Sequence, residues 1–188
     1  NMKLSVDTRM FKLAVDSIEK QRISDSSGGR LIGVTFRLSE DDVLCLETVD
    51  GSRIASATLM ATRQDDDDFT DGVFDLPETL ELDTESPTTL EFTQDQVIIE
   101  NGGLVLVCRR IIGTPIDTSR LFPDESDIEQ EYLFDPRYLA EALSTMKNTG
   151  DTSDSVHLKF QRSDIAPLLI EFEKDGVTQK HLIIPNRT

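Results

Sequence analysis

Apolar and polar residues alternate along three stretches of the chain, and each stretch has the same order of turns. In residues 33–59, two alternating runs flank the polar turn "SEDD", and "DG" then turns the chain into a third run. Residues 88–112 repeat this order with "TQDQ" and "NGG", and residues 156–185 repeat it with "RSD" and "KDG". Alternation with a period of two indicates half-buried strands, and glycine turns between such runs are typical of hairpins. The chain therefore contains an internal repeat of three strands.

A helical pattern precedes the first and the third of these repeats. Residues 7–22 have apolar residues at helical spacing behind a candidate N-cap, Asp7 or Thr8. Residues 135–148 begin with Asp135 as the N-cap, followed by a proline at the first helical position. A short strand-like run leads into each helix, "KLSV" in one and "EYLF" in the other. The complete repeat is therefore predicted to be β-α-β-β-β.

The middle repeat departs from this plan. Its leading segment, "VFDLPETLELDTESPTTLEF", begins like a strand, but Pro77 and Pro87 leave room for one helical turn at most. We therefore predict an α+β fold of three β-α-β-β-β repeats in which the middle helix is short or absent.

Composition places the chain among globular proteins with an acidic surface. The 188 residues are 37% apolar, with no apolar run near the roughly 20 residues of a membrane helix and no signal-peptide core. Cys45 and Cys108 lie inside strand-like runs, so we expect buried thiols and a reducing, cytoplasmic location. The net charge of −17 opposes nucleic-acid binding by the surface as a whole, although it is compatible with a local basic face.

The chain shows none of the common catalytic or metal-binding motifs. His157 and His181 lie in predicted strands without cysteines or carboxylates at zinc-ligand spacing, and "RQDDDDFTDG" lacks the alternate oxygen ligands of a calcium loop. Walker, GxSxG and GxGxxG motifs are missing as well. We expect a protein without catalysis, metal or cofactor, which works by holding a partner.

Four stretches resemble segments of the bacterial DNA polymerase III beta subunit, the sliding clamp. They are "RLIGVTFRL", "VDGSRIA", "LVLVCRRIIGTPIDTSRLFPD" and "LIIPNRT", which occur in the family's order over nearly the whole chain. The resemblance implies a DNA-clamp-like fold built from β-α-β-β-β repeats. In that family three domains of two repeats form a subunit, and two subunits close a ring of twelve repeats. Residues 1–122 resemble the two-repeat central domain, and residues 123–188 resemble the second half of the last domain.

The resemblance also implies a function. A reduced clamp of this kind would be a processivity factor of DNA replication or repair, of phage or mobile-element origin, that binds short linear peptides of polymerases and repair proteins. The alternative is an adaptor or decoy that binds such peptides without encircling DNA. A ring of twelve repeats would need four copies of this chain, so a homo-oligomer favours the first function and a monomer favours the second.

The peptide pocket of the family can be carried over position by position. It would consist of Leu31, Gly51, Ser52, Arg53, Ile54, Pro123, Ile128, Leu182, Ile183, Ile184, Pro185, Asn186 and Arg187. Ser52, Asn186 and Asp127 depart from the family's usual histidine, methionine and basic residue, so this groove would be more polar and more acidic. The alternative is that all these residues are ordinary strand and hairpin positions.

In the family, basic helix residues face duplex DNA. The corresponding residues here would be Arg9, Lys12, Lys20, Arg22, Arg137 and Lys147. Because Asp16, Glu19 and Glu141 lie among them, a solvated helix face explains the pattern equally well.

Overall fold

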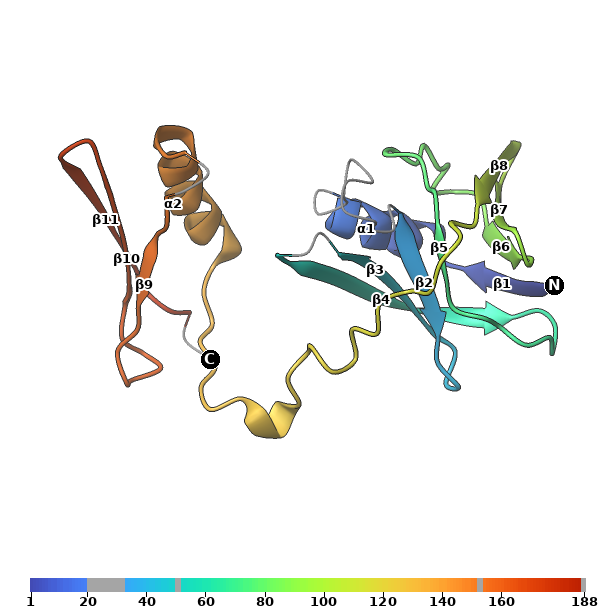
Figure 1. Cartoon of the computed structure of the whole chain (residues 1–188), viewed down its shortest axis with the longest axis horizontal. Coiled ribbons are helices and arrows are strands. Elements are labelled where there is room, and N and C mark those ends of the chain that lie inside the picture. The colour runs from blue at the N-terminus through green and yellow to red at the C-terminus, as the bar shows by residue number, and fades with distance from the viewer. Residues whose placement is uncertain (20–32, 50–51, 152–153, 187–188) are drawn as a thin grey trace. The chain divides into compact units, whose positions relative to one another are not determined.

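The chain divides into two compact units, a first unit of Asn1–Asp117 and a second unit of Thr118–Thr188 (Figure 1). This is a computed structural model that describes residues 1–19, 33–49, 52–151 and 154–186. Each unit has its own hydrophobic core. Among the described residues, no helix is long and apolar enough to cross a membrane.

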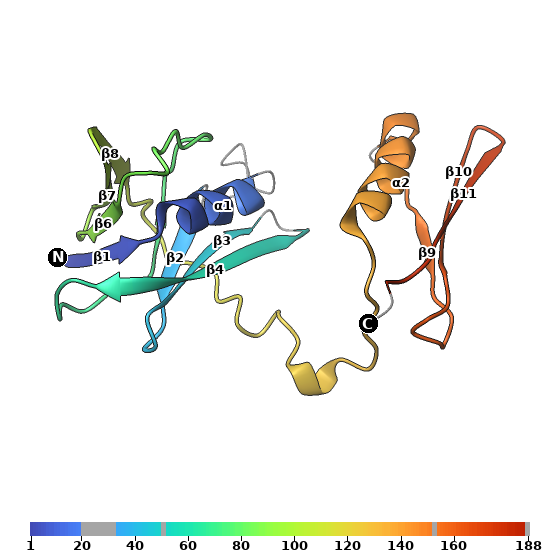
Figure 2. The same ribbon diagram turned by 180° about the vertical axis from the view of Figure 1, so that it is seen from behind.

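The first unit contains two repeats in one eight-stranded antiparallel sheet. The first repeat consists of β1 (Met2–Val6), α1 (Thr8–Glu19), β2 (Val34–Leu38), β3 (Val43–Val49) and β4 (Ile54–Arg63). The second repeat consists of β5 (Gly72–Phe74), β6 (Thr88–Phe92), β7 (Gln96–Asn101) and β8 (Leu104–Arg109). The strand order is β5-β2-β3-β4-β1-β6-β7-β8, so the predicted three-strand hairpin groups are confirmed. Figure 2 shows β6, β7 and β8 side by side.

The two repeats of the first unit are joined by two equivalent strand junctions. β1 pairs with β4 of its own repeat and with β6 of the other. β5 pairs with β2 of the other repeat, and a bridge from Phe74 to Arg110 connects it to the end of β8. The register is the same at both junctions. Leu4 of β1 lies opposite Leu90 of β6, and the equivalent residue of β5, Gly72, lies opposite the equivalent residue of β2, Phe36. The first strand of each repeat therefore completes the sheet of the other.

The middle helix is absent, as predicted. Residues 75–87 contain turns and bends instead, and three leucines of this segment, Leu76, Leu80 and Leu82, are buried in the core of the first unit. The buried side chain of Asn101 holds the end of the segment by donating hydrogen bonds to the carbonyls of Asp83, Ser86 and Pro87. One buried amide thus satisfies backbone groups that a helix would have paired internally.

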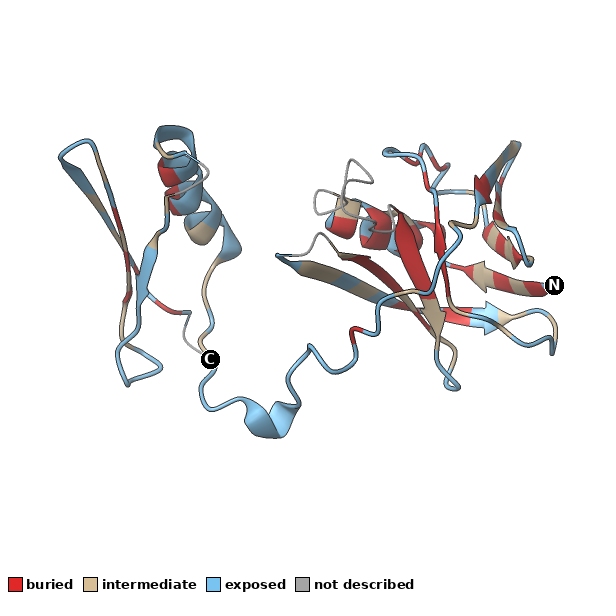
Figure 3. Cartoon of the chain, viewed as in Figure 1, coloured by how far each residue is buried: buried red, intermediate tan, exposed pale blue. Residues whose placement is uncertain are grey.

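Asp7 is the N-cap of α1, because its side chain accepts a hydrogen bond from the backbone N–H of Met10 at 2.9 Å. Thr8 has a different role, since its hydroxyl bonds to the carbonyl of Ser86 at 2.6 Å. Buried residues of α1, among them Phe11 and Ile18, belong to the hydrophobic core of the first unit. Figure 3 shows buried positions of the helix and of the sheet in red. Residues 20–22 of the predicted helix lie outside the described residues.

The second unit contains a single repeat. It consists of η1 (Glu125–Asp127), α2 (Pro136–Thr149), β9 (His157–Lys159), β10 (Leu168–Lys174) and β11 (Val177–Ile183), with sheet order β11-β10-β9. The predicted N-cap is confirmed, since Asp135 accepts a hydrogen bond from the backbone N–H of Arg137 at 2.9 Å. Ala142 and Met146 of α2 belong to the same buried cluster as Ile170 and Phe172 of β10.

The predicted strand over residues 131–134 is wrong. This segment forms no ladder, and its link to the chain end is one hydrogen bond from the backbone N–H of Asn186 to the carbonyl of Leu133 at 2.7 Å. β11 ends at Ile183, and Pro185 has no N–H to donate, so a regular ladder cannot continue along this edge. The segment still contacts the chain that follows β11, the last strand of its repeat, through this one hydrogen bond.

Candidate functional site

The first group of predicted peptide-binding residues surrounds the connection between β3 and β4. Ser52 and Arg53 are exposed, and Ile54 is half-buried at the start of β4, opposite Val49. Gly51 and Leu31 lie outside the described residues. The described part of this group therefore places an exposed arginine and a half-buried isoleucine beside a hairpin.

The second group lies at the end of β11, where exposure alternates with strand periodicity. Leu182 and Ile184 are 64% and 70% exposed, whereas Ile183 is 5% exposed and Pro185 is buried. Ile183 belongs to the core of the second unit, so it anchors the strand. Leu182 and Ile184 are the side chains that a ligand could reach.

The remaining predicted residues of the second unit are also exposed. Pro123 and Ile128 flank η1, and Asn186 follows Pro185, while Arg187 lies outside the described residues. η1 itself carries the carboxylates of Glu125 and Asp127. Ser52–Ile54 belong to the first unit and the other residues to the second, so their convergence on one pocket stays a prediction.

Of the four described basic residues that were predicted to face DNA, three form ion pairs with neighbouring carboxylates. Arg9 forms an ion pair with Glu85, and Lys12 pairs with Asp16 at 2.8 Å. Arg137 pairs with Asp135 at 2.6 Å, and this hydrogen bond lowers the pKa of Asp135 to about 2. Lys147 makes no ion pair with any described residue.

Lys20 and Arg22, the other two predicted DNA-facing residues, lie outside the described residues. Exposed ion pairs contribute little to stability, but each pair removes a cation that a phosphate could otherwise attract. The described parts of the two helices therefore present little free positive charge.

The outward side of α1 carries an apolar surface that the helical pattern did not reveal. Met10 and Leu13 are 57% and 70% exposed. With Ala57 and Leu59 of β4 they line a hollow of about 470 Å³. The three-residue spacing of Met10 and Leu13, next to the buried face of the helix, is the sequence pattern that could have predicted this apolar surface.

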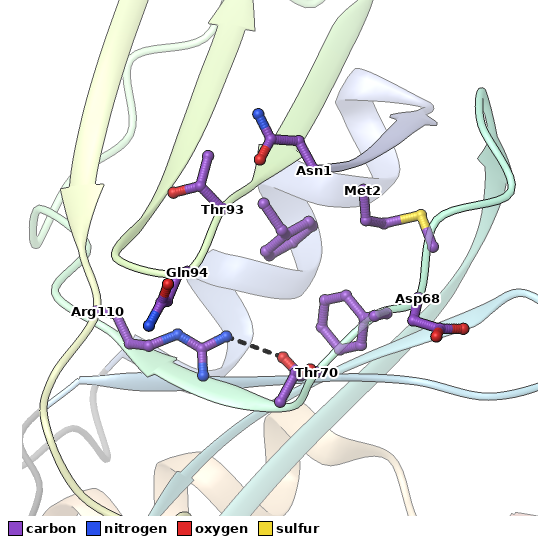
Figure 4. Close-up of a pocket in the computed structure, with 9 residues that line it drawn as sticks. Asn1, Met2, Asp68, Thr70, Thr93, Gln94 and Arg110 are labelled. Carbon is purple, nitrogen blue, oxygen red and sulfur yellow. Dashed lines mark hydrogen bonds between the residues drawn. The ribbon is translucent and has the colours of Figure 1, made fainter.

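A separate cavity of about 230 Å³ lies beside the start of β1 and the turn between β6 and β7 (Figure 4). Arg110 borders it, but its guanidinium donates to the carbonyls of Asp71 and Thr70 at 3.1 and 3.0 Å and lies 5.1 Å from the ring centroid of Phe74. Gly72 makes room for this arginine, since a Cβ there would lie 2.7 Å from its Cζ. The guanidinium of Arg110 therefore holds the loop before β5 through these two hydrogen bonds.

Within the described ranges, no group of three His, Cys, Asp or Glu residues is placed to hold a metal ion. Both cysteines are free; Cys108 is buried as predicted, but Cys45 is half-buried, so that prediction is wrong for Cys45. Its partial burial still raises the pKa of the Cys45 thiol, which disfavours the reactive thiolate at neutral pH.

No protein-family model matches the chain, and no curated protein does. Solved structures do match it. The beta subunit of Streptococcus pyogenes DNA polymerase aligns with a TM-score of 0.79 and 16% identity over 100% of this chain and 50% of its own. The Bartonella birtlesii sliding clamp, DNA polymerase III subunit beta, bound to griselimycin, aligns with a TM-score of 0.75 and 16% identity. That alignment covers 100% of this chain and 52% of the Bartonella chain. This chain has the sliding-clamp fold.

A third structure leads to the same conclusion. DNA polymerase III subunit beta of Borrelia burgdorferi, in complex with a natural product, aligns with a TM-score of 0.75 and 18% identity over 97% of this chain and 47% of its own. The resemblance read from the four sequence motifs is thus confirmed at the level of the fold. The chain spans about half the length of the clamp structures that it matches.

Proposed function

We propose that this chain is a non-catalytic, clamp-like protein of DNA replication or repair, which acts in the cytoplasm and binds short linear peptides of polymerases and other clamp-binding proteins. The observation that carries the proposal is the exposure of Leu182 and Ile184 at the end of β11, in a chain that has the sliding-clamp fold. In this proposal residues 1–122 act as a two-repeat domain and residues 123–188 as a half-domain.

The chemistry of the exposed residues suits an extended peptide. Leu182 and Ile184 would bury an apolar anchor of the peptide, which is favourable by roughly 25 cal/mol per Å² of apolar surface. Arg53, exposed beside Ile54, would pair with a carbonyl or carboxylate of the same peptide. An apolar surface with a few polar groups is the usual composition of such sites.

The ion pairs of the helices favour the version of this function in which DNA is not encircled. Arg9, Lys12 and Arg137 each lie against a carboxylate, and the chain as a whole carries a charge of −17. A track for duplex DNA needs cations that are free to replace counterions. We therefore infer that the chain is a peptide-binding adaptor. The second candidate is a DNA-bound processivity factor, and the sliding-clamp fold favours this second candidate.

Fluorescence anisotropy with a labelled clamp-binding peptide from a bacterial DNA polymerase tests the proposal. Ile184→Ser should weaken binding on the order of ten-fold, because it removes an apolar contact. Ile112→Ser is the matched control, since Ile112 is 97% exposed and lies outside the predicted pocket. Unmeasurable binding by the unaltered chain, or equal losses in both variants, would contradict the proposed function.

A further inference from the structure

The second unit has two open strand edges that are closed in the first unit. Within the described residues, no strand pairs with the outer edge of β9, whereas the equivalent strand β2 is covered by β5. Residues 131–134 correspond to β1, because both segments lead directly into an N-cap aspartate. β1 is covered by β6, but no described strand pairs with residues 131–134.

Apolar side chains at these edges are exposed where their counterparts are buried. At the junctions of the first unit, Phe36 and Leu90 are 0% exposed. Leu158 of β9 and Phe160 just after it are 49% and 51% exposed. Phe160 also lies 5.2 Å, between ring centroids, from Tyr132 of the other open segment. Unpaired strand edges with exposed apolar residues are sites where further strands add.

We propose that two copies of this chain join through their second units, with β9 of each copy pairing antiparallel with residues 131–134 of the other. The first unit shows how such a pairing is built, because its two repeats are joined by the β1–β6 and β2–β5 pairings in the same register. Two copies related by a two-fold axis would close both edges with one self-complementary interface. The result would be a two-repeat domain like the first unit.

The charges along the two edges are complementary. The β9 edge carries His157, Lys159 and Arg162, and the segment before α2 carries Glu129 and Glu131. Phe160 aligns with Phe36, since each lies three residues before the serine of its turn. The pairing of Thr35 with Val73 then corresponds to Lys159 opposite Leu133 of the other copy. That register places Arg162 opposite Gln130 and puts Lys159 diagonally across from Glu131 on the same face, where opposite charges favour the pairing.

A dimer contains six repeats, half of the twelve in a clamp ring, so it does not encircle DNA by itself and is compatible with the adaptor as well as with the processivity factor. The inference rests on strand topology and does not depend on whether the chain binds peptides.

Light scattering after size exclusion, on the full chain over a concentration series, tests the inference. We expect a particle of twice the 21.1 kDa of one chain. Leu158→Glu should shift the dimer dissociation constant by on the order of ten-fold or more, because it places a charge at the buried junction. Val177→Glu is the control, since Val177 is 61% exposed on β11, on the other side of β10 from β9.

Thermal unfolding of both variants distinguishes a lost interface from a lost fold. Hydrogen exchange gives a second measurement on the unaltered chain, in which the amides of residues 131–134 and 157–160 should gain protection as concentration rises. A monomer at all concentrations, or a dimer that resists Leu158→Glu and leaves these amides unprotected, would overturn the proposal.

Discussion

Asn101 and Asp83 are joined by two hydrogen bonds, one from the backbone N–H of Asp83 to Oδ1 of Asn101 at 2.7 Å and one from Nδ2 of Asn101 to the carbonyl of Asp83 at 3.0 Å. Asn101 is 2% exposed and belongs to β7. The end of the segment that replaces the middle helix is therefore held to the sheet by a buried amide.

Asn101→Leu should destabilise the first unit by about 3 kcal/mol, because buried backbone groups that lose their partner cost roughly 1–3 kcal/mol each. Urea unfolding measures this difference. Asn148→Leu is the matched control, since Asn148 is exposed near the end of α2 and its replacement should change stability by less than about 0.5 kcal/mol. Equal effects of the two substitutions would show that Asn101 does not hold the segment.

Arg53→Ala should weaken binding of a clamp-type peptide by on the order of ten-fold without changing thermal stability, because Arg53 is exposed beside the start of β4. Peptide titration and thermal unfolding measure the two effects. Arg120→Ala, also at an exposed position, is the control for the loss of one positive charge. A fall in stability together with affinity would assign Arg53 a structural role.

Deletion of residues 184–188 should abolish peptide binding and leave the first unit folded, because Ile184 and its neighbours follow the last strand of the second unit. Peptide titration measures the binding, and limited proteolysis followed by mass spectrometry measures the integrity of Asn1–Asp117. Binding that survives this deletion would remove the chain end from the site.

Duplex DNA should bind undetectably at low ionic strength, where attraction to phosphates is strongest. The reason is that Arg9 and Lys12 of α1 and Arg137 of α2 are each paired with a carboxylate. A mobility-shift titration at about 10 mM salt checks this, with ionic screening then extending over roughly 30 Å. Clear binding that disappears in Lys147→Ala would instead identify a DNA-facing surface on α2.

Acid should destabilise the second unit through Asp135. The side-chain and backbone hydrogen bonds from Arg137 lower the pKa of Asp135 to about 2 in the folded chain, against about 3.9 in the unfolded chain. A lowered folded-state pKa gives stability that is complete above about pH 4 and is lost as the pH falls towards 2. Thermal unfolding between pH 7 and pH 2 should show this loss.

Asp135→Asn provides the control for that titration, because asparagine caps helices as well as aspartate does but does not ionise. The variant should lose part of the dependence between pH 4 and pH 2. It should keep the part that comes from Asp154 and Glu171, whose pKa values are lowered by hydrogen bonds from Lys174 and Lys159. An unchanged pH profile would show that the cap is not formed through the carboxylate.

Local signals in the sequence predicted the elements of the fold well. The N-cap of α2, the hairpin at Gly176 and the loss of the middle helix between Pro77 and Pro87 all follow from the residues themselves. The strand predicted at residues 131–134 failed because a strand needs a partner ladder, and the run "EYLF" contains no information about Pro185, far along the chain.

The candidate site was less predictable for the same reason. Alternation along β11 determines that Ile183 is buried while Leu182 and Ile184 are exposed, but the motif had grouped all three as pocket residues. The pairing of Arg9 with Glu85 joins two repeats, and no local pattern predicts such a long-range contact.

The position of β1 between β4 and β6 has a consequence for how the chain acquires its structure during synthesis. Met2 pairs with Phe92, so β1 leaves the ribosome long before β6, the strand that pairs with its second edge. Closing contacts so distant along the chain is entropically costly and slows folding. Until β6 emerges, β1 can pair only with β4, and its other edge stays open to neighbouring nascent chains. This interval is when the protein is most exposed to aggregation, and when a chaperone would be of most use to it.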